Sequence, residues 1–145
     1  IFRFPNVVGT PATHGVIYDF ILKIQKNKQL DVLGDGTQKK SYLHVNNLVS
    51  AMLFLSESKE TKKMEIINIG SDDEGIQVSK IAELVRDKMS KEAKIIYGKT
   101  NKGWQGDVPR FFYDISYLRS FGWDQDMSSE SAVIKAVDEI IEQLK

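Results

Sequence analysis

The sequence predicts an α/β fold, and three observations point to it. Short apolar runs typical of strands alternate with segments whose apolar residues recur at helical spacing. A glycine turn at Asp35-Gly36 lies between two of the strand-like runs. The chain has 145 residues, 41% of them hydrophobic and 28% charged, which is enough to bury the core of one domain. We therefore expect one α/β unit over residues 1–145.

The first half of the chain is predicted to contain strands and helices in turn. Ile17, Phe20 and Ile21 share one face of a helix, with charged residues lying off that face. The expected elements are a strand over 1–8, a helix over 13–27, a strand over 30–33, a strand over 42–45 and a helix from 48 to about 58.

The segment around Asp35-Gly36 is expected to be a hairpin, since glycine tolerates the positive φ of a primed turn. Asn46 and Asn47 would cap the following helix by accepting a free backbone N–H. Residues 57–64 are charged and are expected to form a loop. The apolar side of the helix before that loop would contain Leu48, Val49, Met52, Leu53 and Leu55.

The second half of the chain is predicted to continue this pattern. Gln77 would be a weak cap for its first helix, and Gly122 suits the position after a helix end. Ser129 would cap the final helix, which has one apolar face. The expected elements are a strand over 65–69, a helix over 78–89, a strand over 93–97, a polar loop over 98–106 and a final helix from 129.

Composition excludes several kinds of function. Twenty basic and twenty acidic residues balance, so the charge gives no sign of a nucleic-acid partner. The chain has no cysteine, which excludes disulfides and thiol chemistry and favours a cytoplasmic setting. His14 and His44 lie far apart with no carboxylate cluster, so we expect no metal site. No apolar run is long enough to predict a membrane span.

The segment from Leu33 to Leu48 resembles a signature of the extended short-chain dehydrogenase/reductase family, which contains nucleotide-sugar epimerases and dehydratases. Its usual form is V-x-G-D-G-x-Q-x-R-D-[YF]-[IV]-[HY]-V-D-D. Lys40 stands in the Arg slot, and Asn46 and Asn47 stand in the last two Asp slots. The matching residues are Leu33, Gly34, Asp35, Gly36, Gln38, Tyr42, Leu43, His44 and Val45.

Further segments are similar to the family in the expected order. Residues 2–9 resemble the family's L-R-x-x-N-V-x-G-P segment, with Thr10 in the Pro slot. Residues 68–71 resemble N-[IV]-G-[SN], and residues 104–108 resemble R-x-G-D-[VI] with Trp104 in the Arg slot. Residues 114–123 resemble the closing D-x-S-K-x-x-x-x-L-G-W pattern. The resemblance implies the C-terminal part of an extended Rossmann-type fold, mainly its small substrate-binding lobe with edge strands of the dinucleotide sheet.

Two motifs of the family have no counterpart in this chain. It contains no G-x-x-G-x-x-G loop, and no tyrosine is followed by lysine four residues later. In the family that tyrosine is the acid/base and the lysine lowers its pKa. The chain begins with Ile1 rather than Met. We therefore expect a C-terminal fragment that lacks the NAD-binding portion, contains no catalytic residue and is inactive alone.

The resemblance implies binding roles for eight residues. Phe4 would approach the nicotinamide of NAD, and Asn6 would hydrogen-bond the substrate near its phosphates. For Asn6, a residue that bonds its own backbone in a turn is the alternative. Val16, Phe20 and Leu33 would lie against the nucleotide base, and for Val16 and Phe20 plain core packing is the alternative. The expected substrate-binding residues are Asn6, Val16, Phe20, Leu33, Lys40, Trp104 and Asp107.

The diphosphate part of the predicted site departs from the family. Lys40 can pair with phosphate as a point charge, although not as the bidentate fork of arginine, and a solvated Lys40 is the alternative. Trp104 cannot pair with phosphate but could cover an apolar ring. Asp107 would accept from a ribose hydroxyl or, alternatively, form a loop bond. The missing charge could come from Lys39, Lys102 or Arg110.

The function that the resemblance favours is NAD-dependent 4-epimerisation of a UDP-hexose, which interconverts UDP-glucose and UDP-galactose through a 4-keto intermediate. The full-length protein would be a homodimer with a UDP-sugar substrate. A nucleotide-sugar 4,6-dehydratase and a non-catalytic nucleotide- or protein-binding relative remain open as alternatives. The isolated chain would expose an apolar edge and self-associate.

Overall fold

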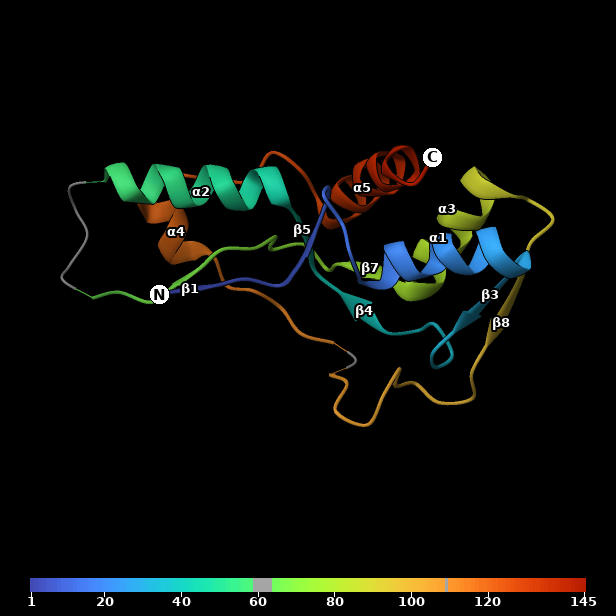
Figure 1. Cartoon of the computed structure of the whole chain (residues 1–145). Helices are drawn as coiled ribbons and strands as arrows, with labels where there is room; N and C mark the ends of the chain where they lie inside the picture. The colour runs from blue at the N-terminus through green and yellow to red at the C-terminus, as the bar shows by residue number, and fades with distance from the viewer. Residues whose placement is uncertain (59–63, 109) are drawn as a thin grey trace.

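The computed structural model describes residues 1–58, 64–108 and 110–145, and its fold is α/β as predicted (Figure 1). In this part of the chain the strands pair two by two. The strands are β1 (Phe2–Arg3), β2 (Asn6–Val8), β3 (Gln29–Val32), β4 (Lys39–Lys40), β5 (Tyr42–His44), β6 (Ile67–Asn68), β7 (Ile76–Gln77) and β8 (Lys94–Tyr97). The helices are α1 (Val16–Asn27), α2 (Val45–Glu57), α3 (Val78–Met89), α4 (Ser116–Ser120) and α5 (Ser129–Gln143).

The predicted first strand is divided into two. β1 pairs in parallel with β6, whereas β2 pairs in parallel with β5, with Asn6 opposite Tyr42. Phe4 and Pro5 lie between β1 and β2, and proline has no N–H to contribute to a ladder. The first eight residues therefore reach two different partners, β6 through β1 and β5 through β2.

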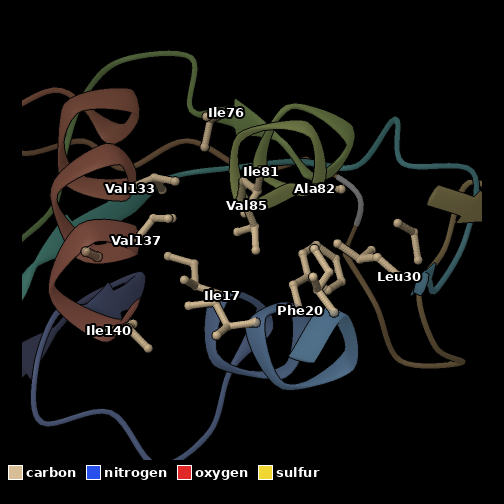
Figure 2. Close-up of a cluster of buried hydrophobic side chains, with 14 of the residues drawn as sticks. Ile17, Phe20, Leu30, Ile76, Ile81, Ala82, Val85, Val133, Val137 and Ile140 are labelled. Carbon is tan, nitrogen blue, oxygen red and sulfur yellow. The ribbon is translucent and has the colours of Figure 1, made fainter. Parts of the chain in front are cut away.

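Strand β5 carries side chains into two hydrophobic cores. Tyr42 belongs to the core between α1, α3 and α5, whereas Leu43 belongs to a second core with α2, α4 and β6. Successive residues of a strand point to opposite faces, which explains the division. Figure 2 shows the first core, where Ile17, Ile81 and Val137 point inward from three different helices. The apolar stripes predicted for these three helices are thus confirmed as core faces.

The expected hairpin is wrong. β3 pairs with β8 and β4 pairs with β7, so the two arms of the turn do not pair with each other. Gly34 and Gly36 do take positive φ angles, of 80° and 79°. The turn is held by distant segments, since Asp35 N donates to Thr100 O at 2.7 Å and Ser79 N donates to Gly36 O at 3.0 Å. The tolerance of glycine for positive φ allows the bend, but tertiary contacts decide which strands pair.

Two of the predicted helix caps are also wrong by a few residues. α2 begins at Val45, and its cap is His44, whose Nδ1 accepts from Asn46 N at 3.3 Å. Asn46 and Asn47 lie inside the first turn of α2. α5 is capped by Ser128, which accepts from Ser131 N at 3.1 Å. The weak cap at Gln77 is as predicted, and so is Gly122, which follows the C-cap Phe121 of α4 and has a φ of 94°.

The apolar side predicted for α2 does not coincide with its buried side. Val49, Met52 and Leu53 are 48%, 37% and 61% exposed. The buried residues of α2 are Asn47, Ala51 and Leu55. Because α2 has no charged residue before Glu57, its sequence alone does not distinguish the two faces. The charged loop predicted over 57–64 lies largely outside the described residues, which omit 59–63.

The exposed face formed by Val49, Met52 and Leu53 leads to a prediction for the 145-residue chain. We expect the chain to self-associate through this face, since apolar residues grouped on a surface favour contact with another apolar surface. Leu53→Glu should weaken self-association about tenfold, corresponding to about 1.4 kcal/mol. Light scattering after size-exclusion chromatography over a range of concentrations measures it. Leu22→Glu on α1, where Leu22 is 39% exposed, is the control, and an equal effect of both variants would contradict the prediction.

Candidate functional site

A cavity of about 690 Å³ lies between α1, strand β2 and the segments that contain Lys40 and Asp107. Its volume is in the range of small-molecule binding sites. Phe4, the residue expected to approach a cofactor, is not among the lining residues and is 45% exposed. The seven residues expected to bind substrate all line this cavity: Asn6, Val16, Phe20, Leu33, Lys40, Trp104 and Asp107.

The ion pair between Lys40 and Asp107 is the most buried pair of opposite charges in the cavity wall. Lys40 Nζ donates to Asp107 Oδ1, and the two side chains are 17% and 5% exposed. The second oxygen, Oδ2, accepts from Gly103 N at 2.9 Å. Burial opposes ionisation of Asp107, but the hydrogen bonds from Lys40 and Gly103 hold its pKa below the ordinary value. Lys40 is therefore not a solvated surface residue, and Asp107 does make the loop bond.

The other cations considered for the diphosphate lie elsewhere. Lys39 pairs with Glu74, and Arg110 lies 4.0 Å from the same carboxylate. Lys102 is exposed and acts on Asp107 only through its charge. Neither Lys39 nor Arg110 is among the residues that line the cavity. Lys40 is thus the candidate with an ammonium group at the cavity wall.

The cavity also has apolar walls. Phe20 on α1 is only 4% exposed and belongs both to the core and to the cavity wall, so core packing and ligand contact are compatible there (Figure 2). Val16 is half-buried one turn earlier. Leu33 and Trp104 are 64% and 67% exposed. The two exposed side chains offer apolar surface to a ring or base that enters the cavity.

Strands β2 and β5 each provide a polar side chain to the cavity wall, Asn6 and Tyr42. Asn6 begins β2, so it lies in a strand rather than in a turn. Tyr42 lies opposite it, and burial together with the nearby charge of Asp107 raises the pKa of Tyr42 above its ordinary value. The phenol therefore stays protonated and can donate a hydrogen bond.

Sequence reasoning missed several polar residues that line the cavity, among them Lys23, Tyr42 and Gln38. Gln38 is 2% exposed and lines the cavity beside Asp107 and Gly103. Its Nε2 donates to Leu33 O at 3.1 Å. Gln38 was part of the matched signature, but the motif alone did not show that its side chain turns inward. In the structure the Gln38 side chain lies between Leu33, to which it is hydrogen-bonded, and Gly103.

Phe4 is the residue proposed to contact a dinucleotide, and it is 45% exposed. The sequence has no glycine-rich loop for a pyrophosphate. Within residues 1–58, 64–108 and 110–145 no three His, Cys, Asp or Glu side chains are grouped as metal ligands. None of the helices described is both long and apolar enough to span a bilayer.

Comparisons with known proteins give a consistent result. Residues 1–70 match the NAD dependent epimerase/dehydratase family. A putative UDP-glucose 4-epimerase of Methanocaldococcus jannaschii is 28% identical over 142 residues, which is 95% of this chain and 44% of that protein. The chain thus spans less than half the length of the relatives it matches.

Solved structures agree with the sequence matches. The crystal structure of a UDP-galactose 4-epimerase superposes with a TM-score of 0.79 at 32% identity, covering 99% of this chain and 46% of the other. The UDP-glucuronic acid 4-epimerase of Bacillus cereus, solved with UDP-glucuronic acid and NAD, has a TM-score of 0.83 at 22% identity and covers 100% and 45%. The likeness to the UDP-glucuronic acid 4-epimerase, at 22% identity, concerns the fold alone. Together the matches support the extended Rossmann-type architecture expected from the motifs.

Proposed function

We propose that this chain, which belongs to the NAD-dependent epimerase/dehydratase family, forms the sugar-nucleotide-binding part of a UDP-hexose 4-epimerase. The observation that carries the proposal is the common cavity of Asn6, Lys40 and Asp107, which come from three separate segments. In this proposal residues 1–145 are the C-terminal substrate-binding portion of the enzyme. The likeness to a UDP-galactose 4-epimerase at 32% identity supports this substrate class.

The diphosphate, the ribose and the base of a UDP-sugar each have a partner of suitable chemistry in the cavity. Lys40 brings a positive charge to the diphosphate, and Asn6 brings an amide that can donate to its oxygens. Asp107 offers carboxylate acceptors to the ribose hydroxyls. The base would lie against Val16, Phe20 and Leu33, and Trp104 would cover one face of a ligand ring.

NAD, when bound, would supply reversible hydride transfer at C4 of the sugar. In this chain only Phe4 is proposed as part of the nicotinamide wall, and the remaining contacts would come from a dinucleotide-binding portion. The residues of this chain bind and orient the sugar nucleotide, and the chain alone is proposed to be inactive because it contains no Y-x-x-x-K pair. A cytoplasmic homodimer completes the proposal, and the absence of cysteine supports the compartment.

A non-catalytic binding relative is the second candidate. Trp104 occupies a position where the family has arginine, and Lys40 is already paired with Asp107. Both features lower the positive charge available to a diphosphate. They are compatible with a protein that binds a nucleotide weakly and does not turn it over.

Incubation of the full-length protein with NAD and UDP-glucose tests these alternatives. We expect UDP-galactose to form, and chromatography of the nucleotide sugars measures it. A 4-keto-6-deoxy product would instead identify a 4,6-dehydratase. Binding of UDP-glucose in calorimetry without any product would favour the non-catalytic relative, and no binding at all would exclude the proposed substrate class.

A further inference from the structure

The cation proposed for the diphosphate and the carboxylate proposed for the ribose are bound to each other. Lys40 Nζ and Asp107 Oδ1 form an ion pair, although the two residues are 67 positions apart in the sequence. Both side chains line the cavity and both are largely buried. A ligand cannot form an ion pair with Lys40, or use the full hydrogen-bonding capacity of Asp107, while these two groups are bound to each other.

The remaining charges of the cavity do not relieve this competition. Among the described lining residues, the acidic ones are Asp19 and Asp107 and the lysines are Lys23 and Lys40. Lys23 Nζ donates to Asp31 O at 2.7 Å and lies 5.9 Å from the centre of the Phe20 ring. Lys40 is therefore the lining lysine that is paired with a lining carboxylate, and an anion that binds Lys40 must draw it from Asp107.

We propose that the Lys40–Asp107 pair is exchanged when ligand binds: the diphosphate takes Lys40, and Asp107 turns its released oxygen to the ribose hydroxyls. This inference rests on the proposed function. Asp107 keeps its other oxygen on Gly103 N, at 2.9 Å, so the loop stays anchored during the exchange. The pair is thus a contact in the cavity wall, and only a ligand with both an anion and a diol separates it while giving each of the two charged groups a new hydrogen-bond partner.

The exchange predicts that the two halves of the ligand respond differently to the charge of Asp107. Asp107→Asn removes the charge that holds Lys40 but keeps an oxygen for Gly103 N. Pyrophosphate, which has no ribose, should bind at least about tenfold more tightly, since Lys40 no longer has to be drawn away from a charged carboxylate. UDP should change less than pyrophosphate, because it loses the carboxylate acceptor for its ribose.

Glu74→Gln is a matched control within the same chain. Glu74 pairs with Lys39, the neighbour of Lys40, and neither of these residues lines the cavity. The substitution changes the net charge by the same amount and also releases a lysine. We expect it to leave pyrophosphate binding within about twofold, so a gain confined to Asp107→Asn does not come from overall charge.

Calorimetric titration of the full-length protein with pyrophosphate and with UDP provides the test, and thermal unfolding checks that each variant is folded. A gain of tenfold for pyrophosphate in Asp107→Asn alone supports the exchange. Equal affinity in wild type and Asp107→Asn, or the same gain in Glu74→Gln, overturns it. If UDP does not bind the wild type, the proposed function fails; if UDP binds but the pyrophosphate gain is absent, only the exchange fails.

Discussion

Asp73→Ala is expected to lower the free energy of unfolding by about 3 kcal/mol, because Asp73 anchors the start of α5. Its carboxylate accepts from Ser129 N, from Ser129 Oγ at 2.6 Å and from Gly75 N at 2.8 Å. Ser129 is 1% exposed, so donors left without an acceptor there would not reach water easily. Ser129 Oγ also accepts from Tyr42 N at 3.1 Å, which links α5 to a strand of the cavity wall. Chemical denaturation measures the loss.

The neighbouring aspartate is the control for this prediction. Asp72 pairs with Arg119 and accepts a hydrogen bond from Gln125 Nε2 at 3.1 Å, and both interactions are exposed to solvent. Exposed pairs of this kind contribute about 0–1 kcal/mol, so Asp72→Ala should cost less than about 1 kcal/mol. Equal losses in the two variants would show that Asp73 has no special anchoring role.

The contribution of Asp73 should depend on pH in a definite direction. Burial opposes its ionisation, but the hydrogen bonds from Ser129 prevail and hold its pKa below the ordinary 3.8. A carboxyl whose pKa is lower in the folded state stabilises the fold fully above the unfolded pKa and loses this contribution as pH falls through the folded pKa. The difference between wild type and Asp73→Ala should therefore be constant near neutral pH and narrow below about pH 4.

The helices with one buried face could be predicted from the sequence. Ile17, Ile81 and Val137 lie on stripes bounded by charged residues, so their periodicity indicated which face is buried. In α2 the residues around Leu53 are apolar on nearly every side, and periodicity could not indicate which face packs inward. Prediction of the buried face depends on contrast between faces, and α2 lacks that contrast.

Strand partners could not be predicted in the same way. The turn at Asp35-Gly36 gave a correct bend but a wrong hairpin, because β3 and β4 pair with strands far along the chain. The division of residues 1–8 at Pro5 likewise depends on which segment lies beside each half. Local sequence carries turn geometry, whereas long-range pairing is decided by packing that short motifs do not encode.

The residues of the cavity were predicted through motifs, but their relations to each other were not. The motifs predict a phosphate contact for Lys40 and a ribose contact for Asp107, without any relation between the two residues. The structure adds that they neutralise each other, which no spacing in the sequence reveals. Gln38 fits the family motif, but the motif does not tell where its side chain lies. In the structure that side chain is buried between Leu33 and Gly103.

The largest effect on binding is expected from Lys40→Met, which should weaken the affinity for UDP by about 10- to 100-fold. Hydrogen bonds to charged groups contribute about 1.5–3 kcal/mol, and the variant removes the ammonium of the inner wall. It also leaves Asp107 unpaired beside the incoming diphosphate, and two negative groups in a buried site repel each other. Calorimetric titration of the full-length protein with UDP measures the change.

Lys39→Met and Lys40→Arg make this prediction specific. Lys39 is the adjacent residue of β4, but it pairs with Glu74 away from the cavity, so its loss should change UDP affinity by less than about twofold. Lys40→Arg keeps the charge and can bind two phosphate oxygens at once, so it should retain or increase affinity. If Lys39→Met and Lys40→Met weaken binding equally, the diphosphate responds only to overall charge, and the cavity wall at Lys40 is not where it lies.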